Sequence, residues 1–198
     1  MKKLLLVAAV IGCSVGTWIP SGLAGEEGGL QDLFPEGLLT AQGEEVSLDA
    51  LKGKEVVGIY FSAHWCGPCR AFTPKLVKYR DTQQDNIEIV FVSSDHSEEK
   101  QFAYMKEEGM KWLTVKYKSD AANALKKKYG ITGIPTLVLV DENGDTITRG
   151  GRQFVTDDVP AAKIAAAKVV QEEYTCDRCD KIHTREKLVF EDGPGSKS

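Results

Sequence analysis

Apolar residues gather in two nearly unbroken runs in the first half of the chain. The first spans Lys54–Ala63 and the second Ile87–Ser94, and both are rich in β-branched and aromatic residues. Runs of this length and composition are typical of strands that are buried on both faces of a sheet. Between them, apolar side chains recur every three or four residues over 66–82, which predicts one buried helix face made by Phe72, Leu76 and Tyr79.

Caps and glycines mark the ends of two more helices further along the chain. Ser97 precedes a helix that ends near Gly109, and Ser119 precedes a second one that ends at Gly130. An Asn143-Gly144 turn joins two apolar runs into a predicted hairpin. We also expect three smaller or later elements, which are a short hairpin around Gly43, a short strand over 112–117 and an Ala-rich helix over 156–174.

Taken in order, these elements predict an α/β fold with a mixed central sheet and helices on both faces. The chain has 198 residues and 42% apolar content, which is enough for one sizeable core. Its net charge is −4 and no stretch interleaves basic and aromatic residues, so we expect no nucleic-acid partner. We divide the chain into a leader at 1–24, a flexible lead-in at 25–37, a domain at 38–173 and a tail at 174–198.

The first 24 residues have the layout of an export signal. Lys2 and Lys3 form a basic start, Leu4–Val15 is apolar, and small residues lie near Gly22–Ala24. The apolar run is shorter than the roughly 20 residues that span a bilayer. We therefore expect an exported protein, periplasmic or secreted. The alternative is a lipoprotein lipidated at Cys13, since Val10–Cys13 is similar to a lipobox, and only then do we expect the protein at a membrane.

Four of the five cysteines form two CxxC pairs, Cys66/Cys69 and Cys176/Cys179. A disulfide that closes so short a loop constrains little of the unfolded chain and stabilises the fold weakly. Stapling is therefore a poor explanation for either pair. A CxxC that follows a buried strand and opens a helix instead indicates a redox couple.

The predicted position of Cys66 favours its ionised form. Unpaired backbone N–H groups and the positive end of the helix dipole stabilise an anion at a helix start. The thiolate is the nucleophile in disulfide chemistry, so Cys66 is expected to attack a substrate. Cys69 lies one turn further in and is expected to resolve the mixed disulfide.

The segments "WCGPC" at 65–69 and "YGITGIPTLVLVDENGDTI" at 129–147 resemble the thioredoxin family. The surrounding segments "IYFSAHWCGPCRAFTPKLVKYR", "VFVSSD" and "WLTV" are similar to its tryparedoxin and nucleoredoxin branch. The resemblance covers Leu38–Arg152 and implies a thioredoxin-like fold. It also implies a cis peptide bond before Pro135, which would lie against the CxxC, and an Ile134 backbone that pairs with substrate.

The motif itself is also expected to contact the substrate. Trp65 is expected at the rim of the site, Gly67 to allow close approach of another backbone, and Pro68 to fit the helix start. One departure from thioredoxins concerns the buried acid six residues before the first cysteine, which is Tyr60 here. Tryparedoxin-like proteins lack this acid too, and the proton acceptor for Cys69 is left open. His64 is expected to be a surface residue at the rim.

These residues predict an exported thiol–disulfide oxidoreductase that works as a reductase rather than an oxidase, because Gly67-Pro68 matches thioredoxin, a reducing protein. The alternative is a thioredoxin-fold binding module without catalysis, which would not need both cysteines, the Gly-Pro spacer and Pro135 together. The expected partners are proteins that carry disulfides or thiols, together with an unidentified electron donor. We expect no cofactor and no metal at this site.

The tail contains Cys176, Cys179 and His183. These supply three metal ligands, whereas a tetrahedral zinc site normally has four. Three interpretations stay open: an inert or auxiliary local disulfide, which we favour, a second redox couple, or part of a zinc site.

Overall fold

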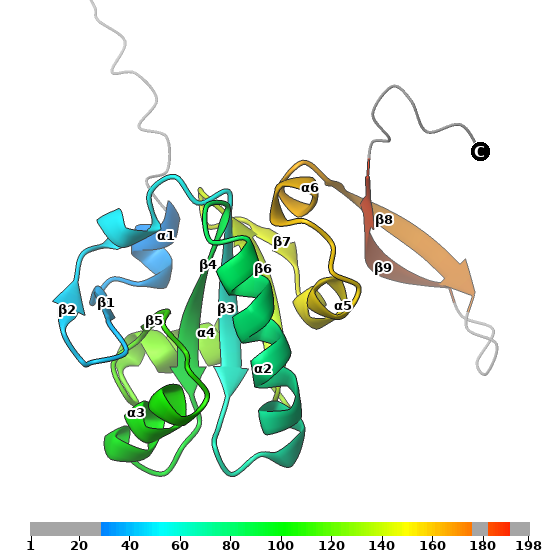
Figure 1. The fold of residues 1–198 in the computed structure, drawn as a ribbon. Coiled ribbons are helices and arrows are strands. Elements are labelled where there is room, and N and C mark those ends of the chain that lie inside the picture. The colour runs from blue at the N-terminus through cyan, green and yellow to red at the C-terminus, as the bar shows by residue number, and fades with distance from the viewer. Residues whose placement is uncertain (1–28, 176–181, 191–198) are drawn as a thin grey trace, which may run out of the picture.

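The computed structural model describes residues 29–175 and 182–190, and a seven-stranded mixed sheet lies at its centre (Figure 1). The strand order is β2-β1-β5-β4-β3-β6-β7. β3, β4 and β5 run parallel, and the other neighbours are antiparallel. The strands are β1 (Leu38–Leu39), β2 (Glu45–Val46), β3 (Val56–Ser62), β4 (Ile87–Ser93), β5 (Leu113–Thr114), β6 (Thr136–Asp141) and β7 (Thr146–Thr148).

Helices cover both faces of this sheet, so the predicted α/β architecture is confirmed (Figure 1). The large helices α2 and α3 pack on one face, and α4 packs on the other with the short α1. The helices are α1 (Gly29–Leu33), the 3-10 turn η1 (Leu48–Leu51), α2 (Gly67–Thr82), α3 (Glu98–Glu107), α4 (Asp120–Lys128), α5 (Gly151–Thr156) and α6 (Ala161–Ala165).

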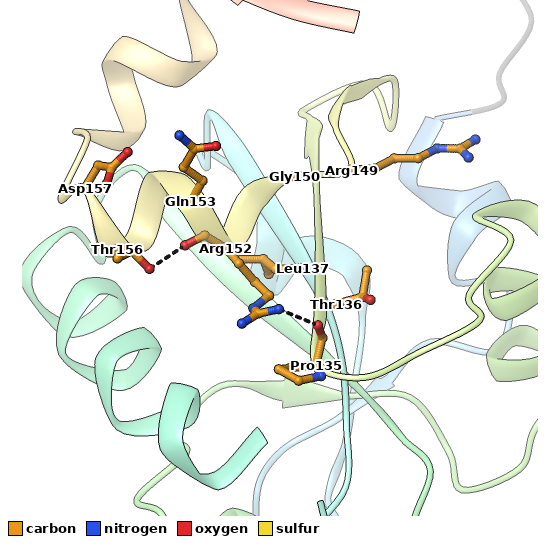
Figure 2. Close-up of a pocket in the computed structure, with 9 residues that line it drawn as sticks. All are labelled: Pro135, Thr136, Leu137, Arg149, Gly150, Arg152, Gln153, Thr156 and Asp157. Atoms are coloured by element: carbon orange, nitrogen blue, oxygen red, sulfur yellow. Dashed lines mark hydrogen bonds between the residues drawn. The ribbon is translucent and has the colours of Figure 1, made fainter. Parts of the chain in front are cut away.

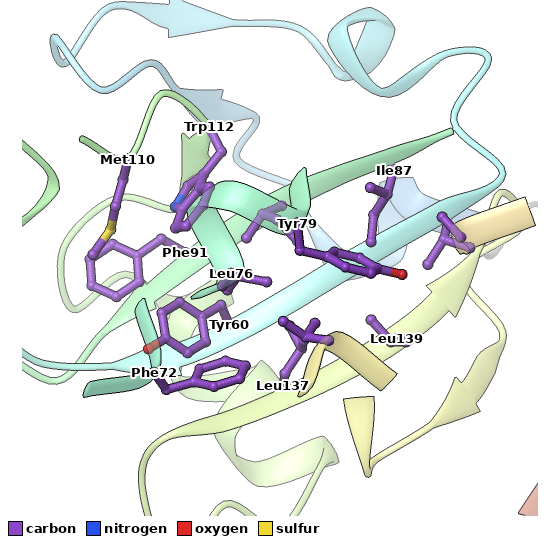
Figure 3. Packing of buried hydrophobic residues seen from close by; sticks show 14 of the residues in the cluster. Tyr60, Phe72, Leu76, Tyr79, Ile87, Phe91, Met110, Trp112, Leu137 and Leu139 are labelled. Atoms are coloured by element: carbon purple, nitrogen blue, oxygen red, sulfur yellow. The ribbon is translucent and has the colours of Figure 1, made fainter. Parts of the chain in front are cut away.

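Strand β3 shows why helices pack on both faces of the sheet. All of its side chains are buried, and successive ones point to opposite faces of the sheet. Tyr60 therefore enters the cluster beneath α2 and α3, whereas Ile59 and Phe61 enter the cluster beneath α4. Figure 3 shows Tyr60 among the aromatic and aliphatic side chains of the first cluster, which include Phe72, Leu76 and Phe91.

The helix ends follow the local signals in the sequence. Ser97 and Ser119 cap α3 and α4, and each hydroxyl accepts the backbone N–H three residues later, at 3.3 Å and 3.1 Å. Gly109 and Gly130 follow these helices with φ of +68° and +57°, a conformation that glycine adopts at low cost. Both serine caps and both C-terminal glycines are as predicted.

The predicted flexible lead-in at 25–37 differs from the structure where it is described. Residues 29–33 form α1, and Leu33 and Phe34 are buried in the cluster beneath α4. Leu30, Leu33 and Phe34 are spaced three and four residues apart, so one apolar face packs although glycine and acidic residues surround it. The folded domain therefore begins before 38.

The predicted Ala-rich helix over 156–174 is wrong. The chain instead forms the short helices α5 and α6 and then strand β8 (Lys168–Thr175), which pairs with β9 (Ile182–Val189) in a separate two-stranded antiparallel sheet. Pro160 interrupts the first part, since it precedes α6 in an extended conformation with ψ of 136°. The boundary expected at 173 falls inside β8. Cys176 and Cys179 lie outside the described residues.

Figure 1 shows the β8–β9 hairpin standing at the side of the main body, next to α5 and α6. In the part of the chain that the structure describes, no helix is both long enough and apolar enough to cross a membrane.

Candidate active site

Cys66 and Cys69 lie where strand β3 gives way to helix α2, as predicted. Cys66 is the N-cap of α2, and its Sγ accepts the Cys69 backbone N–H at 3.3 Å. The two cysteines form a disulfide with their Cα atoms 5.2 Å apart. Cys66 keeps 6% of its surface exposed, whereas Cys69 has none. Of the two sulfur-bearing residues, Cys66 is therefore the one that a substrate can reach.

The Ile134–Pro135 peptide bond is cis, and this segment lies against the disulfide. The Ile134 carbonyl oxygen is 3.7 Å from Cys66 Sγ, and Ile134 packs against the small cluster of Ala63 and the two cysteines. The fold thus brings together two segments that are 68 residues apart in the sequence. This is the juxtaposition that the resemblance to thioredoxins implied.

Trp65 projects from the motif with 57% of its surface exposed. Its Nε1 donates to the Ser94 carbonyl oxygen at 3.1 Å, and its ring stacks on His96 at 6.0 Å between centroids. Gly67 and Pro68 form the exposed first turn of α2. Apart from its chain neighbours and the backbone of α2, no atom of the described residues lies within 4 Å of where a Gly67 side chain would begin, so the surface here is open to a partner.

The turn after β4 contacts the motif through Asp95, a residue that the sequence analysis did not single out. Asp95 is 4% exposed, and its Oδ1 accepts the His64 backbone N–H at 2.8 Å. Its Oδ2 accepts the Ser93 hydroxyl, also at 2.8 Å. Polar residues directly after a buried parallel strand are a sequence signal for a site at that edge of the sheet, and "VSSDH" carries it.

A chain of hydroxyl groups lies beneath Cys69, where thioredoxins have an acid. Thr73 Oγ1 donates to the Cys69 carbonyl oxygen at 3.0 Å, so it accepts the hydroxyls of Tyr60 at 2.8 Å and Tyr104 at 2.7 Å. Burial raises the pKa of both tyrosines, because it disfavours the charged phenolate. They therefore remain protonated hydroxyl groups at neutral pH.

Ionisable side chains flank the motif on the α3 side. His64 Nε2 lies 2.8 Å from Glu107 Oε2, and Arg70 Nη2 lies 3.4 Å from Oε1 of the same carboxylate. Arg70 also approaches Glu108 at 3.8 Å. His64 was expected to be a surface residue at the rim, but it is partly buried, with its ring centre 5.4 Å from that of Tyr104.

A pocket of about 470 Å³ opens beside Pro135. Figure 2 shows Arg152 reaching from α5 toward the Pro135 carbonyl oxygen, to which its Nη1 donates at 3.3 Å. The guanidinium also lies 5.2 Å from the centre of the Phe72 ring. Within residues 29–175 and 182–190, no three His, Cys, Asp or Glu side chains gather closely enough to hold a metal ion.

Comparisons with known proteins agree with this geometry. Residues 53–146 match the family profile described as thioredoxin-like. Human nucleoredoxin is 46% identical over 125 residues, and probable nucleoredoxin 1 of Arabidopsis thaliana is 39% identical over 130 residues. These alignments cover 61% and 62% of this chain but only 28% and 22% of the two relatives. The chain thus spans less than a third of the nucleoredoxins that it matches.

This chain covers a larger share of the solved structures that it resembles. Thioredoxin from Wuchereria bancrofti is 44% identical, with a TM-score of 0.57 over 65% of this chain and 90% of that chain. Tryparedoxin II from C. fasciculata is 34% identical, with a TM-score of 0.60 over 67% and 89% of the two chains.

The predicted export is overturned by these relatives. Nucleoredoxins and tryparedoxins are cytosolic or nuclear proteins, not exported ones. The composition of residues 1–24, on which the prediction rested, therefore does not establish an exported protein. Those residues and Cys13 lie outside the described part of the chain.

The disulfide at the start of α2, the cis proline beside it and the relatives all point to one assignment. This chain belongs to the thioredoxin-like family of thiol–disulfide oxidoreductases, in the branch of the nucleoredoxins and tryparedoxins.

Proposed function

We propose that this protein reduces disulfide bonds in protein substrates, with Cys66 as the attacking residue and Cys69 as the resolving one. The observation that carries the proposal is the difference between the two cysteines. Cys66 caps α2 and is partly accessible, whereas Cys69 is fully buried one turn later. An attacking thiol must meet the substrate, and a resolving thiol needs only to reach its partner.

The reaction exchanges one disulfide for another. The Cys66 thiolate attacks one sulfur of a substrate disulfide, which forms a mixed disulfide and releases the other substrate sulfur as a thiolate that takes up a proton. Cys69 then loses its proton and attacks Cys66 Sγ, so the Cys66–Cys69 disulfide forms and the second substrate thiol leaves. The substrate gains two electrons, and a thiol donor must return two electrons to the protein afterwards.

Five residues around the cysteines would bind the substrate. An extended substrate segment can pair with the backbone of Ile134, whose carbonyl oxygen faces Cys66, in the manner of an added strand. Pro135 shapes this segment and Trp65 offers an exposed aromatic surface. Gly67 and Pro68 leave the surface in front of Cys66 open.

The Gly-Pro spacer favours reduction as the direction of the reaction. Thioredoxin, which carries the same spacer, has a potential of about −270 mV, against about −120 mV for the strongly oxidising DsbA. A measured potential for the Cys66–Cys69 couple tests this direction. A value near that of DsbA would contradict the assignment as a reductase.

Trapping with cysteine variants tests the two roles. A Cys69→Ser variant should accumulate mixed disulfides with substrate proteins, because the resolving thiol is missing, and Cys66→Ser should form almost none. The measurement is the yield of adducts on non-reducing gels, beside reduction of insulin by dithiothreitol with and without the protein. Equal trapping by both variants would contradict the roles. No acceleration of insulin reduction would favour a thioredoxin-fold binding module instead.

A further inference from the structure

Three successive backbone carbonyls at the end of β4 gather side chains from three parts of the chain. The Ser93 oxygen accepts Lys126 Nζ at 3.0 Å, the Ser94 oxygen accepts Trp65 Nε1 at 3.1 Å, and the Asp95 oxygen accepts the Tyr117 hydroxyl at 2.9 Å. Trp65 precedes the attacking cysteine directly. The turn therefore places Lys126 of α4 and the loop at 116–119 beside the active-site motif.

This loop carries a lysine in an unusual backbone conformation. Lys118 has φ of +51°, a left-handed geometry that costs a non-glycine residue roughly 1 kcal/mol or more. Its side chain is exposed, and its Nζ lies 5.2 Å from the centre of the Tyr117 ring. Tyr117 is itself anchored on Asp95, so the ring under the Lys118 ammonium is fixed relative to Trp65.

Lys118 and Lys126 are close enough to influence each other. Burial lowers the pKa of Lys126 first, and the positive charge of Lys118 lowers it further. In the described part of the chain, no carboxylate lies within 4 Å of either ammonium group, although Asp120 begins α4 directly after this loop. The nearby Asp95 is buried and already bonded to His64 and Ser93.

The two sides of the motif thus differ in charge balance. On the α3 side, Arg70 has two carboxylate partners, Glu107 at 3.4 Å and Glu108 at 3.8 Å. On the α4 side, the two lysines have no carboxylate partner of this kind among residues 29–175 and 182–190. A substrate carboxylate can therefore pair with them without displacing another carboxylate, and Lys126 has further N–H donors beside the one that binds the Ser93 carbonyl oxygen. Attraction of opposite charges also raises the rate at which partners meet.

We propose that the Trp65–His96 stack together with Lys118 and Lys126 forms a docking surface, here called the basic rim, for substrates with acidic residues beside their disulfide. The inference rests on the proposed disulfide reductase activity and adds the substrate class. The aromatic stack contacts the segment next to the substrate cysteine, and the lysines pair with its flanking carboxylates. Lys118 and Lys126, on the side of the motif that faces α4, would thus favour substrates with acidic residues.

The test uses three disulfide-bonded peptides that differ only in the residues flanking the cysteine, which are glutamate, glutamine or lysine. The fully reduced protein is mixed with each peptide, and the second-order rate of thiol release is measured at low and high salt. We expect the glutamate peptide to react about threefold to tenfold faster than the glutamine peptide. This advantage should shrink at high salt, because exposed charges are screened beyond about one Debye length.

Variants locate the preference on the basic rim. Lys118→Glu should remove or reverse the preference for the glutamate peptide, and Lys118→Gln should weaken it. Lys78→Glu is the matched control, since it makes the same change in net charge on an exposed face of α2. It lies twelve residues beyond Cys66, about 18 Å along the helix, and should keep the preference.

Equal rates for the three peptides, or an unchanged preference in Lys118→Glu, would overturn the basic rim while leaving the reductase activity in place. A preference lost equally in Lys78→Glu would overturn it as well, because net charge would then be the cause. Failure to reduce any of the peptides, including the neutral one, would count against the proposed function and this inference with it.

Discussion

At the scale of single residues, the Thr73 hydroxyl connects the buried cysteine to the aromatic core. It donates to the Cys69 carbonyl oxygen and accepts two tyrosine hydroxyls. Thr73→Val keeps the shape but leaves the buried Tyr60 hydroxyl without its acceptor. We expect a loss of about 2–3 kcal/mol in the free energy of unfolding, measured by urea denaturation.

Tyr60→Phe is the matched control for this prediction. It removes one hydroxyl, while Thr73 keeps its bonds to Cys69 and Tyr104. The expected loss is about 1 kcal/mol, because no buried donor is left unpaired. Losses of equal size in the two variants would mean that the hydroxyl of Thr73 does not organise the network.

Whether a residue of the candidate site could be predicted depends on how far away in the sequence its contacts lie. Cys66, Cys69 and Pro135 were predictable because the first two form one local motif and the resemblance carries the third. The contacts of Asp95 and Tyr104 were not, since each acts on a residue about thirty positions away, Asp95 on His64 and Tyr104 on Thr73. The polar segment that contains Asp95 marks the sheet edge but does not name its partner. No periodicity or spacing within a short window reports such contacts.

At the scale of elements, the sequence predicted those whose signals are local. The buried runs became β3 and β4, and serine caps with closing glycines fixed α3 and α4. The segment 156–174 was predicted as a helix from its alanines, yet β8, which begins inside it, pairs with a strand that comes later in the chain. Helix propensity is a weak preference that such pairing overrides.

Helix α5 packs closely on strand β6, and Gly151 makes this possible. A Cβ on Gly151 would lie 2.8 Å from the Leu137 carbonyl oxygen, a backbone atom that cannot rotate away. Gly151→Ala should therefore lower the free energy of unfolding by about 1–3 kcal/mol, through displacement of α5. Thermal and urea unfolding measure this loss.

Gly150→Ala provides the control one position earlier. A Cβ there would meet only the Thr148 side-chain oxygen at 3.6 Å, an ordinary contact. Its φ of −96° is also open to alanine. We expect an effect below about 1 kcal/mol. A Gly151→Ala variant as stable as Gly150→Ala would show that α5 moves freely on the sheet.

At the scale of the whole molecule, the β8–β9 hairpin is an addition to the thioredoxin-like domain. Its two strands pair with each other and not with the central sheet. Phe190 joins it to the main body, with its ring centre 6.2 Å from that of Phe154 on α5, and Lys163 lies 5.1 Å from the centre of the Phe190 ring. These contacts lie beside α5 and α6. Near the C-terminal end of α2, the Tyr79 hydroxyl donates to the Val159 carbonyl oxygen in the loop that precedes α6. Cys66 lies at the other end of α2.

Truncation after Ala167 removes the hairpin without cutting an element of the domain. We expect reduction of insulin to stay within about twofold of the full chain, a change of about 0.4 kcal/mol in the barrier, because none of the described groups around Cys66 is lost. Stability should fall by about 1–3 kcal/mol as Phe154 loses its aromatic partner. In the full chain, Phe190→Ala should reproduce most of that loss and leave the rate unchanged. If truncation instead abolishes most of the activity while Phe190→Ala does not, the segment after 167 takes part in the reaction itself.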